Sequence, residues 1–362
     1  MKFELEENAK RYLTALLKKN EDNSTASFLL NEYLLLDHSR DKEVMESYGG
    51  FSLNSLLAIF DGSINAEEEE YIRFVRENPD YFSFKKIDEK IYENNPYYIL
   101  LRNASSSYKG VHLGKRAYAP YEGFLEDEIH AEKENLYQEI SPFGYFLHGF
   151  FAPALEKKGR IWMSLIPHEI HTMKKDIEQA EGDVLTFGLG LGYYAFMISQ
   201  KEEVKTVTII EKDRSIIDLF KKELLPLFPK KEKIRIIEED AFSFLKKEDC
   251  SRYDHCFVDL WHNEEDGLPI YLSFKKEEAK KKLSFSYWIE GSILVYLRRY
   301  VFALIQEELD GKEDEDYPEG DFVDNLFRKL HFLLKEKTLR KKEDIDDLLE
   351  ERNLKGIAPL LG

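Results

Sequence analysis

The feature that most constrains the fold of this chain is an apolar strand that runs directly into a glycine-rich turn. The segment 183–192, DVLTFGLGLG, is followed by a helical pattern over 193–200 and by a second apolar strand that ends at Glu211. The turn holds three glycines at alternate positions: Gly188, Gly190 and Gly192. Such glycines let the backbone approach a ligand, and an acid that ends the next strand accepts hydrogen bonds from ribose hydroxyls. This order of elements predicts a nucleotide-binding unit.

The spacing of the glycines narrows the class of ligand. The pattern is G-x-G-x-G and not the G-x-G-x-x-G of dinucleotide enzymes. A tighter loop directs fewer backbone N–H groups at phosphate, so it suits a ligand without a pyrophosphate. Taken alone, the same turn is also consistent with a glycine-rich connection that binds nothing.

Two further strands are predicted downstream, and each ends near an acid. The segment 233–239 precedes Asp240 and Ala241, and the segment 253–260 holds Asp259 near its end. Strands that alternate with helical segments predict a parallel sheet with crossover helices. Ligands bind such sheets beyond the carboxyl ends of the strands. The glycines and the acids are therefore expected to meet at one edge of the sheet.

Over about 166–299, these residues resemble class I S-adenosylmethionine-dependent methyltransferases, and among them the spermidine-synthase-like branch. The resemblance rests on the glycine loop and on three motifs: Ile210-Glu211-Lys212-Asp213, Asp240-Ala241 and Phe257-Val258-Asp259-Leu260. It implies a Rossmann-like α/β fold with a mostly parallel sheet and S-adenosylmethionine as cofactor. The glycine loop would pack against the methionine part of the cofactor, Glu211 would bind the ribose, and Asp240 the adenine. Lys212 and Ala241 accompany these acids as cofactor-binding candidates, and Asp259 would lie near the sulfonium.

Departures from the family pattern bear on the reaction. Phe187 stands where most such methyltransferases carry an acid before the glycines. Aminopropyl transferases usually carry an acid directly after the glycines, where Tyr193 stands here, and a second acid a few residues past the one on the fourth strand. We therefore expect transfer of a methyl group from S-adenosylmethionine to a small or cationic substrate. Two alternatives stay open: an aminopropyl or alkyl transferase of the spermidine synthase type, and a non-catalytic S-adenosylmethionine-binding or scaffold protein.

Asp259 and His262 are the candidate catalytic residues. His262 follows Asp259 by three residues, just beyond the end of the fourth strand. Imidazole ionises near neutral pH, so a histidine there can orient or deprotonate a nucleophile, and a loop histidine that only shapes the pocket is the alternative. Trp261 is expected to stack on a substrate or to form an apolar wall. His168 and His171 lack the H-E-x-x-H spacing, and no metal site is predicted.

The charge of the chain limits its partners. The 362 residues carry a formal net charge of −18, which disfavours nucleic acid, because proteins that bind nucleic acid normally present a basic face. The expected partner is a small-molecule substrate, and a homodimer is left open. The chain has two cysteines, too few for a disulfide framework, and lacks the apolar run of about twenty residues that a membrane span needs. A cytoplasmic location is therefore expected.

Four regions are predicted along the chain: a helical N-terminal domain (1–105), an aromatic, hairpin-rich connecting region (106–165), a Rossmann-like S-adenosylmethionine-binding domain (166–305) and a C-terminal helical extension (306–362). The helices predicted from apolar periodicity are 2–20, 25–36, 51–60, 66–77, 85–94, 167–178, 290–309, 321–336 and 343–350. A fifth strand is predicted within 283–289, and helices replace the last two strands of a complete class I sheet.

Overall fold

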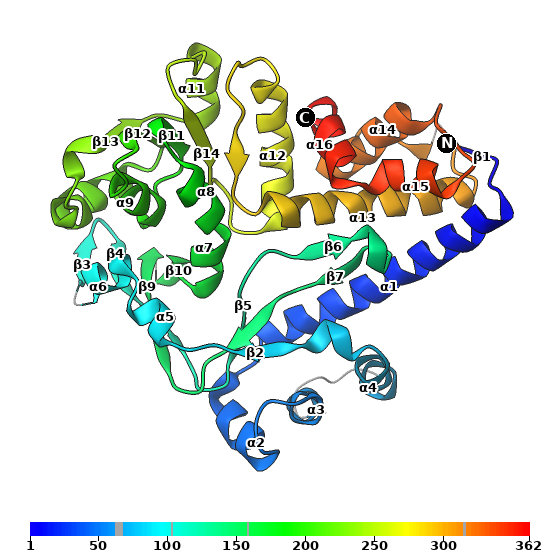
Figure 1. The fold of residues 1–362 in the computed structure, drawn as a ribbon, viewed down its shortest axis with the longest axis horizontal. Coiled ribbons are helices and arrows are strands. Elements are labelled where there is room, and N and C mark those ends of the chain that lie inside the picture. Colours follow the sequence, from blue (N-terminus) through cyan, green and yellow to red (C-terminus); the bar gives the residue numbers. More distant parts are fainter. Residues whose placement is uncertain (62–67, 103, 158, 314–315) are drawn as a thin grey trace.

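A five-stranded parallel sheet forms the centre of the α/β part of the molecule (Figure 1). The structure is a computed structural model, and it describes residues 1–61, 68–102, 104–157, 159–313 and 316–362. The strands lie in the order β13 (Ile234–Glu238), β12 (Val204–Glu211), β11 (Gly182–Phe187), β14 (His255–Val258) and β15 (Ser286–Tyr287), and each neighbouring pair is parallel. The predicted α/β class with a mostly parallel, Rossmann-like sheet is confirmed.

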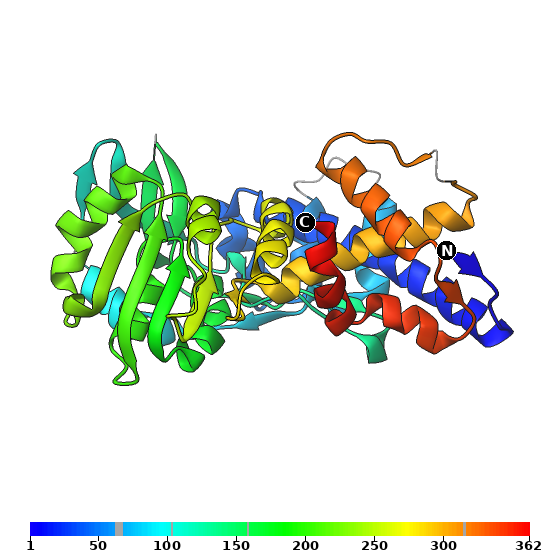
Figure 2. The ribbon, with the colours of Figure 1, turned by 90° about the horizontal axis from the view of Figure 1, so that it is seen from above.

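Crossover helices follow the first four of these strands and lie beside the sheet (Figure 2). They are α9 (Tyr193–Ser199), α10 (Arg214–Leu219), α11 (Ala241–Lys247) and α12 (Glu264–Glu278). The α9 sequence, YYAFMIS, carries no charge, and nearly all of its residues are buried. The apolar runs of β11 and β14 are buried as well, as expected of central parallel strands that are covered on both faces.

The sheet ends at a strand shorter than the predicted 283–289. Only Ser286 and Tyr287 pair with β14, and α13 (Glu290–Leu309) begins soon afterwards. The remaining C-terminal elements are α14 (Phe322–Leu334), β16 (Thr338–Leu339), α15 (Lys342–Leu349) and α16 (Glu351–Leu361). Within the described residues, β16 pairs with β1 (Lys2–Phe3) at the other end of the chain instead of extending the parallel sheet.

Helix α1 (Glu7–Leu34) is continuous, although the sequence predicted two helices with a break at the polar stretch 21–24. Asn23, within that stretch, is buried. Its amide donates to the Tyr137 carbonyl at 2.9 Å, and its side-chain oxygen accepts from the Tyr81 hydroxyl at 2.7 Å and from the Glu139 N–H at 3.0 Å. Because distant partners satisfy this polar side chain, the helix passes through the core without interruption.

Shorter helices follow α1: α2 (Asp41–Ser47), α3 (Leu53–Asp61), α4 (Glu68–Glu77), α5 (Lys90–Glu93) and α6 (Pro96–Leu101). The predicted helix 66–77 corresponds to α4, and residues 66 and 67 lie outside the described residues. The predicted helix 85–94 is wrong in its first half, because β2 (Phe84–Lys86) pairs with β8 (Phe143–Tyr145). Pairing with a distant strand therefore overrides the local helical pattern there.

Antiparallel pairs dominate residues 106–165. Their strands are β3 (Ser106–Tyr108), β4 (Val111–Tyr118), β5 (Gly123–Leu125), β6 (His130–Glu132), β7 (Gln138–Ile140), β8, β9 (Phe150–Lys157) and β10 (Arg160–Ser164). The hairpin of β9 and β10 leads into α7 (Pro167–Thr172) and α8 (Lys174–Gln179), which enter the first strand of the parallel sheet. This order places the hairpin next to the beginning of the α/β part.

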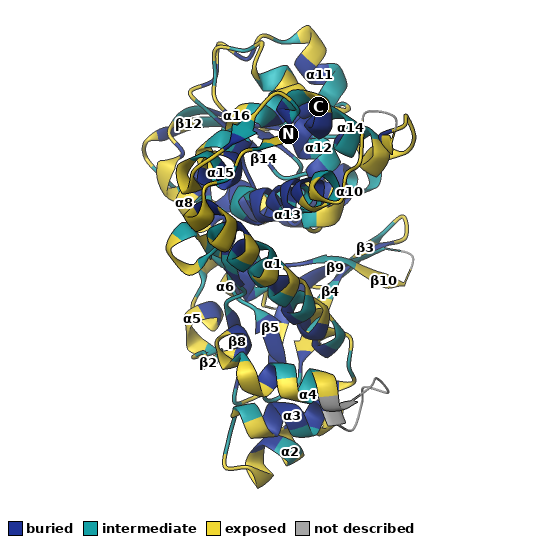
Figure 3. Cartoon of the chain, turned by 90° about the vertical axis from the view of Figure 1, so that its right-hand side faces the viewer, coloured by how far each residue is buried: buried dark blue, intermediate teal, exposed yellow. Residues whose placement is uncertain are grey.

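The N-terminal strand β1 lies beside the C-terminal helical region (Figure 1), since β1 pairs with β16 and α1 contacts α13 and α15. Figure 3 shows buried residues gathered along α13 and exposed ones on the outer side of α1. Among the helices in the described ranges, none is both long and apolar enough to cross a membrane.

Candidate functional site

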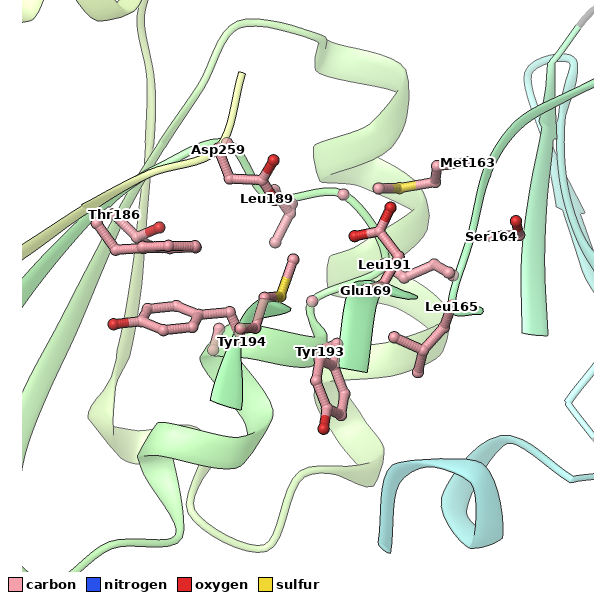
Figure 4. A pocket seen from close by; sticks show the side chains of 16 residues that line it. Met163, Ser164, Leu165, Glu169, Thr186, Leu189, Leu191, Tyr193, Tyr194 and Asp259 are labelled. Atoms are coloured by element: carbon pink, nitrogen blue, oxygen red, sulfur yellow. The ribbon is translucent and has the colours of Figure 1, made fainter. Parts of the chain in front are cut away.

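A cavity of about 590 Å³ opens at the carboxyl ends of β11, β12, β13 and β14. A much smaller space of about 30 Å³ adjoins it behind the glycine loop, and Figure 4 shows the side chains around this smaller space. The cavity is large enough for a nucleoside-sized ligand, whereas the smaller space holds about one water molecule. A cavity therefore lies at the edge of the sheet where parallel α/β folds bind their ligands.

The structure brings the predicted site residues together. Those that line the larger cavity are Gly188, Gly190, Glu211, Lys212, Asp240, Ala241, Asp259 and His262. Gly192 lines the smaller space, together with Gly188, Gly190 and Asp259. Their shared location follows from the parallel sheet, which places successive strand ends at one edge. The binding and catalytic role of each residue stays a prediction.

Two glycines of the loop have positive φ angles, which strain any residue with a side chain, and they lie close to neighbouring groups. Gly188 has a φ of +97°, and a Cβ there would collide with the backbone carbonyl oxygen of Asp259. Gly190 has a φ of +50°, and a Cβ would lie 2.5 Å from Cε of Met163. The loop is thus pressed between the end of β14 and the β9–β10 hairpin, and its glycines permit that close approach.

Glu211 links the glycine loop to the turn after β12. One carboxylate oxygen accepts from the Leu189 N–H at 3.2 Å, and the other accepts from the Asp213 N–H at 2.7 Å. Burial raises the pKa of Glu211, while these backbone hydrogen bonds oppose the rise. The carboxylate is therefore held in place at the cavity wall, where it can also accept hydrogen bonds from a ligand.

Asp259 shares its end of the cavity with a second carboxyl, that of Glu169. Figure 4 shows the two carboxyl groups directed into the same space from opposite sides. Burial raises the pKa of Asp259 to about 7; His262 opposes this effect and Glu211 adds to it. Burial raises the pKa of Glu169, and the charge of Asp259 raises it further. Two acids in one enclosed site resist simultaneous ionisation and favour a cation beside them.

Glu169 is a site residue that sequence reasoning missed. It lies in the first turn of α7, which begins at Pro167 and precedes the sheet. In the sequence, the PHEIH segment (167–171) draws attention only to its two histidines. His168 is buried against Trp288, and burial lowers the pKa of His168 to about 4. Over the described ranges, no three His, Cys, Asp or Glu side chains gather as metal ligands.

The β9–β10 hairpin contributes residues that the sequence also did not identify. Trp162 and Met163 of β10 line the cavity. Lys157 of β9 forms an ion pair with Asp213 and lies 5.6 Å from the centre of the Trp162 ring. The hairpin is therefore attached to the turn after β12, and only its folded position shows that it reaches the site.

His262 and Trp261 differ in their exposure. The side chain of His262 is 60% exposed at the mouth of the cavity, and its ring centre lies 6.3 Å from that of Trp162. Trp261 is buried and its ring stacks with that of Tyr287 at 6.4 Å, so it forms an apolar wall. Most aromatic residues of 97–151 are buried in the core, and none of them lines the cavity.

Residues 166–282 match the family model of the spermine/spermidine synthase domain. Among solved structures, the spermidine synthase from Thermotoga maritima is similar, with 16% sequence identity and a TM-score of 0.28. The similarity covers 41% of this chain and 58% of that enzyme. None of the curated proteins matches the chain.

The family match corrects two expectations. The expected methyltransferase function is wrong, because the matched family favours aminopropyl transfer and nothing in the match is specific to methyl transfer. S-Adenosylmethionine as a resident cofactor is wrong too, because spermidine synthases consume the decarboxylated compound as a substrate. What the match supports is a spermidine-synthase-like domain of a transferase family.

Proposed function

We propose that this chain is an aminopropyl transferase of the spermidine synthase type, which transfers an aminopropyl group from decarboxylated S-adenosylmethionine to an amine. The family match over 166–282 supports the class of reaction. The observation that carries the choice of donor is the pair of half-buried carboxyl groups, Glu169 and Asp259, which line the same end of the cavity.

The charge of this pair selects among sulfonium donors. At an effective dielectric constant of about 20, two unit charges 4 Å apart interact by about 4 kcal/mol. A donor that retains the methionine carboxylate would place a third carboxyl group beside Glu169 and Asp259, which already resist ionising together. The decarboxylated donor brings only an ammonium and a sulfonium, and both are attracted. Of the cationic side chains described at the cavity, Lys157 is already paired with Asp213, and Lys212 lies on the turn after β12.

Glu169 also compensates for a departure from the family pattern. The position after the glycines, usually acidic in aminopropyl transferases, is Tyr193. Glu169 lines the same small space as Tyr193 and Gly192, although it comes from α7. A carboxyl group from another element thus lies beside the glycine loop, where a cation from the donor would favour its ionised form. We propose that Glu169 binds the ammonium of the aminopropyl group, and that Glu211 and Asp240 bind the adenosyl part.

The reaction requires little from the protein beyond orientation. The lone pair of the acceptor nitrogen attacks the methylene carbon bonded to the sulfonium. A C–N bond forms, the C–S bond breaks with its electron pair moving to sulfur, and the nitrogen loses a proton. The products are an aminopropylated amine and a neutral thioether, methylthioadenosine. Fixing the two substrates in line and excluding water supply most of the acceleration.

The test is turnover of purified full-length protein with decarboxylated S-adenosylmethionine and a panel of amines that includes putrescine. Mass spectrometry should detect methylthioadenosine and an aminopropylated amine, and the same panel with S-adenosylmethionine should give no methylated product. Donor binding by calorimetry without product from any amine would favour the scaffold alternative. A methylated product, or no binding of the decarboxylated donor, would contradict the proposal.

Glu169→Gln tests the residue that carries the proposal. It removes the charge and keeps the shape, so the KM for the donor should rise roughly 10- to 100-fold, the loss expected for a hydrogen bond to a charged group. Glu239→Gln is the matched control, because Glu239 lines the other end of the cavity and already pairs with Lys247. Equal effects of the two substitutions would mean that the position of the charge does not matter.

A further inference from the structure

A second carboxylate stands behind His262. The His262 Nδ1 atom lies 3.0 Å from Oδ2 of Asp266. The backbone N–H of His262 donates to Oδ1 of Asp266 at 3.0 Å, and that of Asn263 donates to the same oxygen at 2.9 Å. Asn263 caps α12, and Asp266 is the reciprocal partner in that capping box. The N-terminus of α12 therefore holds the Asp266 carboxylate in a fixed position against the imidazole.

This contact determines which ring nitrogen carries the proton. A carboxylate only accepts hydrogen bonds, so a neutral imidazole beside it must present Nδ1–H. The other nitrogen, Nε2, is then left with a free lone pair, which is the form that accepts a proton. His262 lines the cavity beside Trp162 and is close enough to Asp259 to oppose the rise in the pKa of that acid.

We propose that Asp266 is a positioning residue that holds His262 as the Nδ1–H tautomer, and that Nε2 of His262 accepts the proton of the acceptor amine. The proposal rests on the proposed aminopropyl transfer. An acceptor enters as R–NH3⁺ and gives one proton to Nε2, and the resulting R–NH2 attacks the donor carbon. The C–S electron pair goes to sulfur, and the imidazolium passes its proton to water. Atoms and charge balance without a further reactant.

The exposure of His262 distinguishes it from the two acids. Glu169 and Asp259 are half-buried, and partial burial raises the pKa of each carboxyl. The His262 side chain is 60% exposed, so it can exchange its proton with water. Asp266 and Asp259 are the charged groups of its own segment that interact with it, and Lys157, over the Trp162 ring, is one of the cations of the cavity lining. Asp266 is the one that contacts Nδ1.

The tautomer can be measured without turnover. In full-length protein with ¹⁵N-labelled histidine, two-bond NMR correlations report which nitrogen is protonated, and His262→Asn identifies the signal. Wild type should show Nδ1–H at alkaline pH. Asp266→Asn should lose this preference, because an amide donates as well as accepts. Asn263→Ala, which removes the other half of the capping box, should keep it. A wild-type Nε2–H tautomer would overturn the proposal.

Kinetics then test whether the tautomer matters. Asp266→Asn should lower kcat roughly 10- to 100-fold, the usual loss when a group that orients a histidine is removed, with KM values within about twofold. Asn263→Ala should stay within about twofold of wild type in kcat, because it weakens only the helix cap. An unchanged kcat in Asp266→Asn, or equal losses in both variants, would overturn the positioning role. If the wild-type protein shows the Nδ1–H tautomer but transfers no aminopropyl group, the proposed function is contradicted. The Asp266–His262 contact would still stand.

Discussion

Asp259→Asn is expected to stabilise the fold at neutral and alkaline pH while it abolishes transfer. Burial raises the pKa of this carboxyl from 3.8 to about 7. The folded protein therefore keeps the proton up to about pH 7, whereas the unfolded chain loses it near pH 4. Between these values the folded state binds more protons, so rising pH favours unfolding.

The magnitude follows from the same shift. A difference of about 3 pKa units corresponds to about 4 kcal/mol at full effect. Because the cavity admits water, which screens the charge, we expect about 2 kcal/mol of this in the measured stability. Asparagine carries no charge at any pH, so the variant avoids the penalty. Its gain in unfolding free energy should be absent near pH 4, grow between pH 4 and 7, and stay constant above pH 7.

Urea denaturation of both proteins at pH 4, 6 and 8 measures this gain. Asp240→Asn is the matched control, because Asp240 is an exposed acid at the rim of the same cavity. Its side chain caps α11 by accepting a hydrogen bond from the Ser243 N–H at 2.9 Å, and the amide oxygen of asparagine can still accept that bond. The control should show a small difference that does not vary with pH. An Asp259→Asn variant that is less stable than wild type at pH 8, or equally more stable at every pH, would refute the burial argument. Combining it with Glu169→Gln should give a non-additive change, because the two acids interact.

Two further substitutions test the glycine loop and the long helix. Gly188→Ala should abolish donor binding in calorimetric titrations, because the new methyl group would collide with the Asp259 carbonyl; Gly356→Ala, with no atom within 4 Å of its added Cβ, should bind normally. Asn23→Ala should lower the unfolding free energy by about 2–4 kcal/mol, since it leaves buried polar partners unsatisfied. Denaturation of Ser24→Ala, which loses only one exposed hydrogen bond, should show a far smaller change.

The parts of the site that sequence could predict lie at strand ends. Once the pattern around Gly188 and Glu211 indicates a parallel sheet, topology alone places their successors Asp240 and Asp259 at the same edge. Glu169 could not be placed in this way, because the direction in which a helix before the first strand presents its side chains depends on its packing. The same limit applies to helix boundaries. The break predicted in α1 failed because the partners of its buried polar side chain are far away in sequence.

The cavity is completed by residues that precede the matched segment 166–282. Trp162 and Met163 line it from β10, and the ion pair of Lys157 with Asp213 attaches the hairpin to the turn that holds Glu211. We propose that the strand-end residues, which resemble the family, bind the decarboxylated donor. All aminopropyl transfers use this same donor. The hairpin packs against the glycine loop and the turn after β12, and it is the part of the wall that the family match does not include. Related chains that keep the strand-end residues and change this hairpin are therefore expected to keep the donor and to use a different acceptor amine.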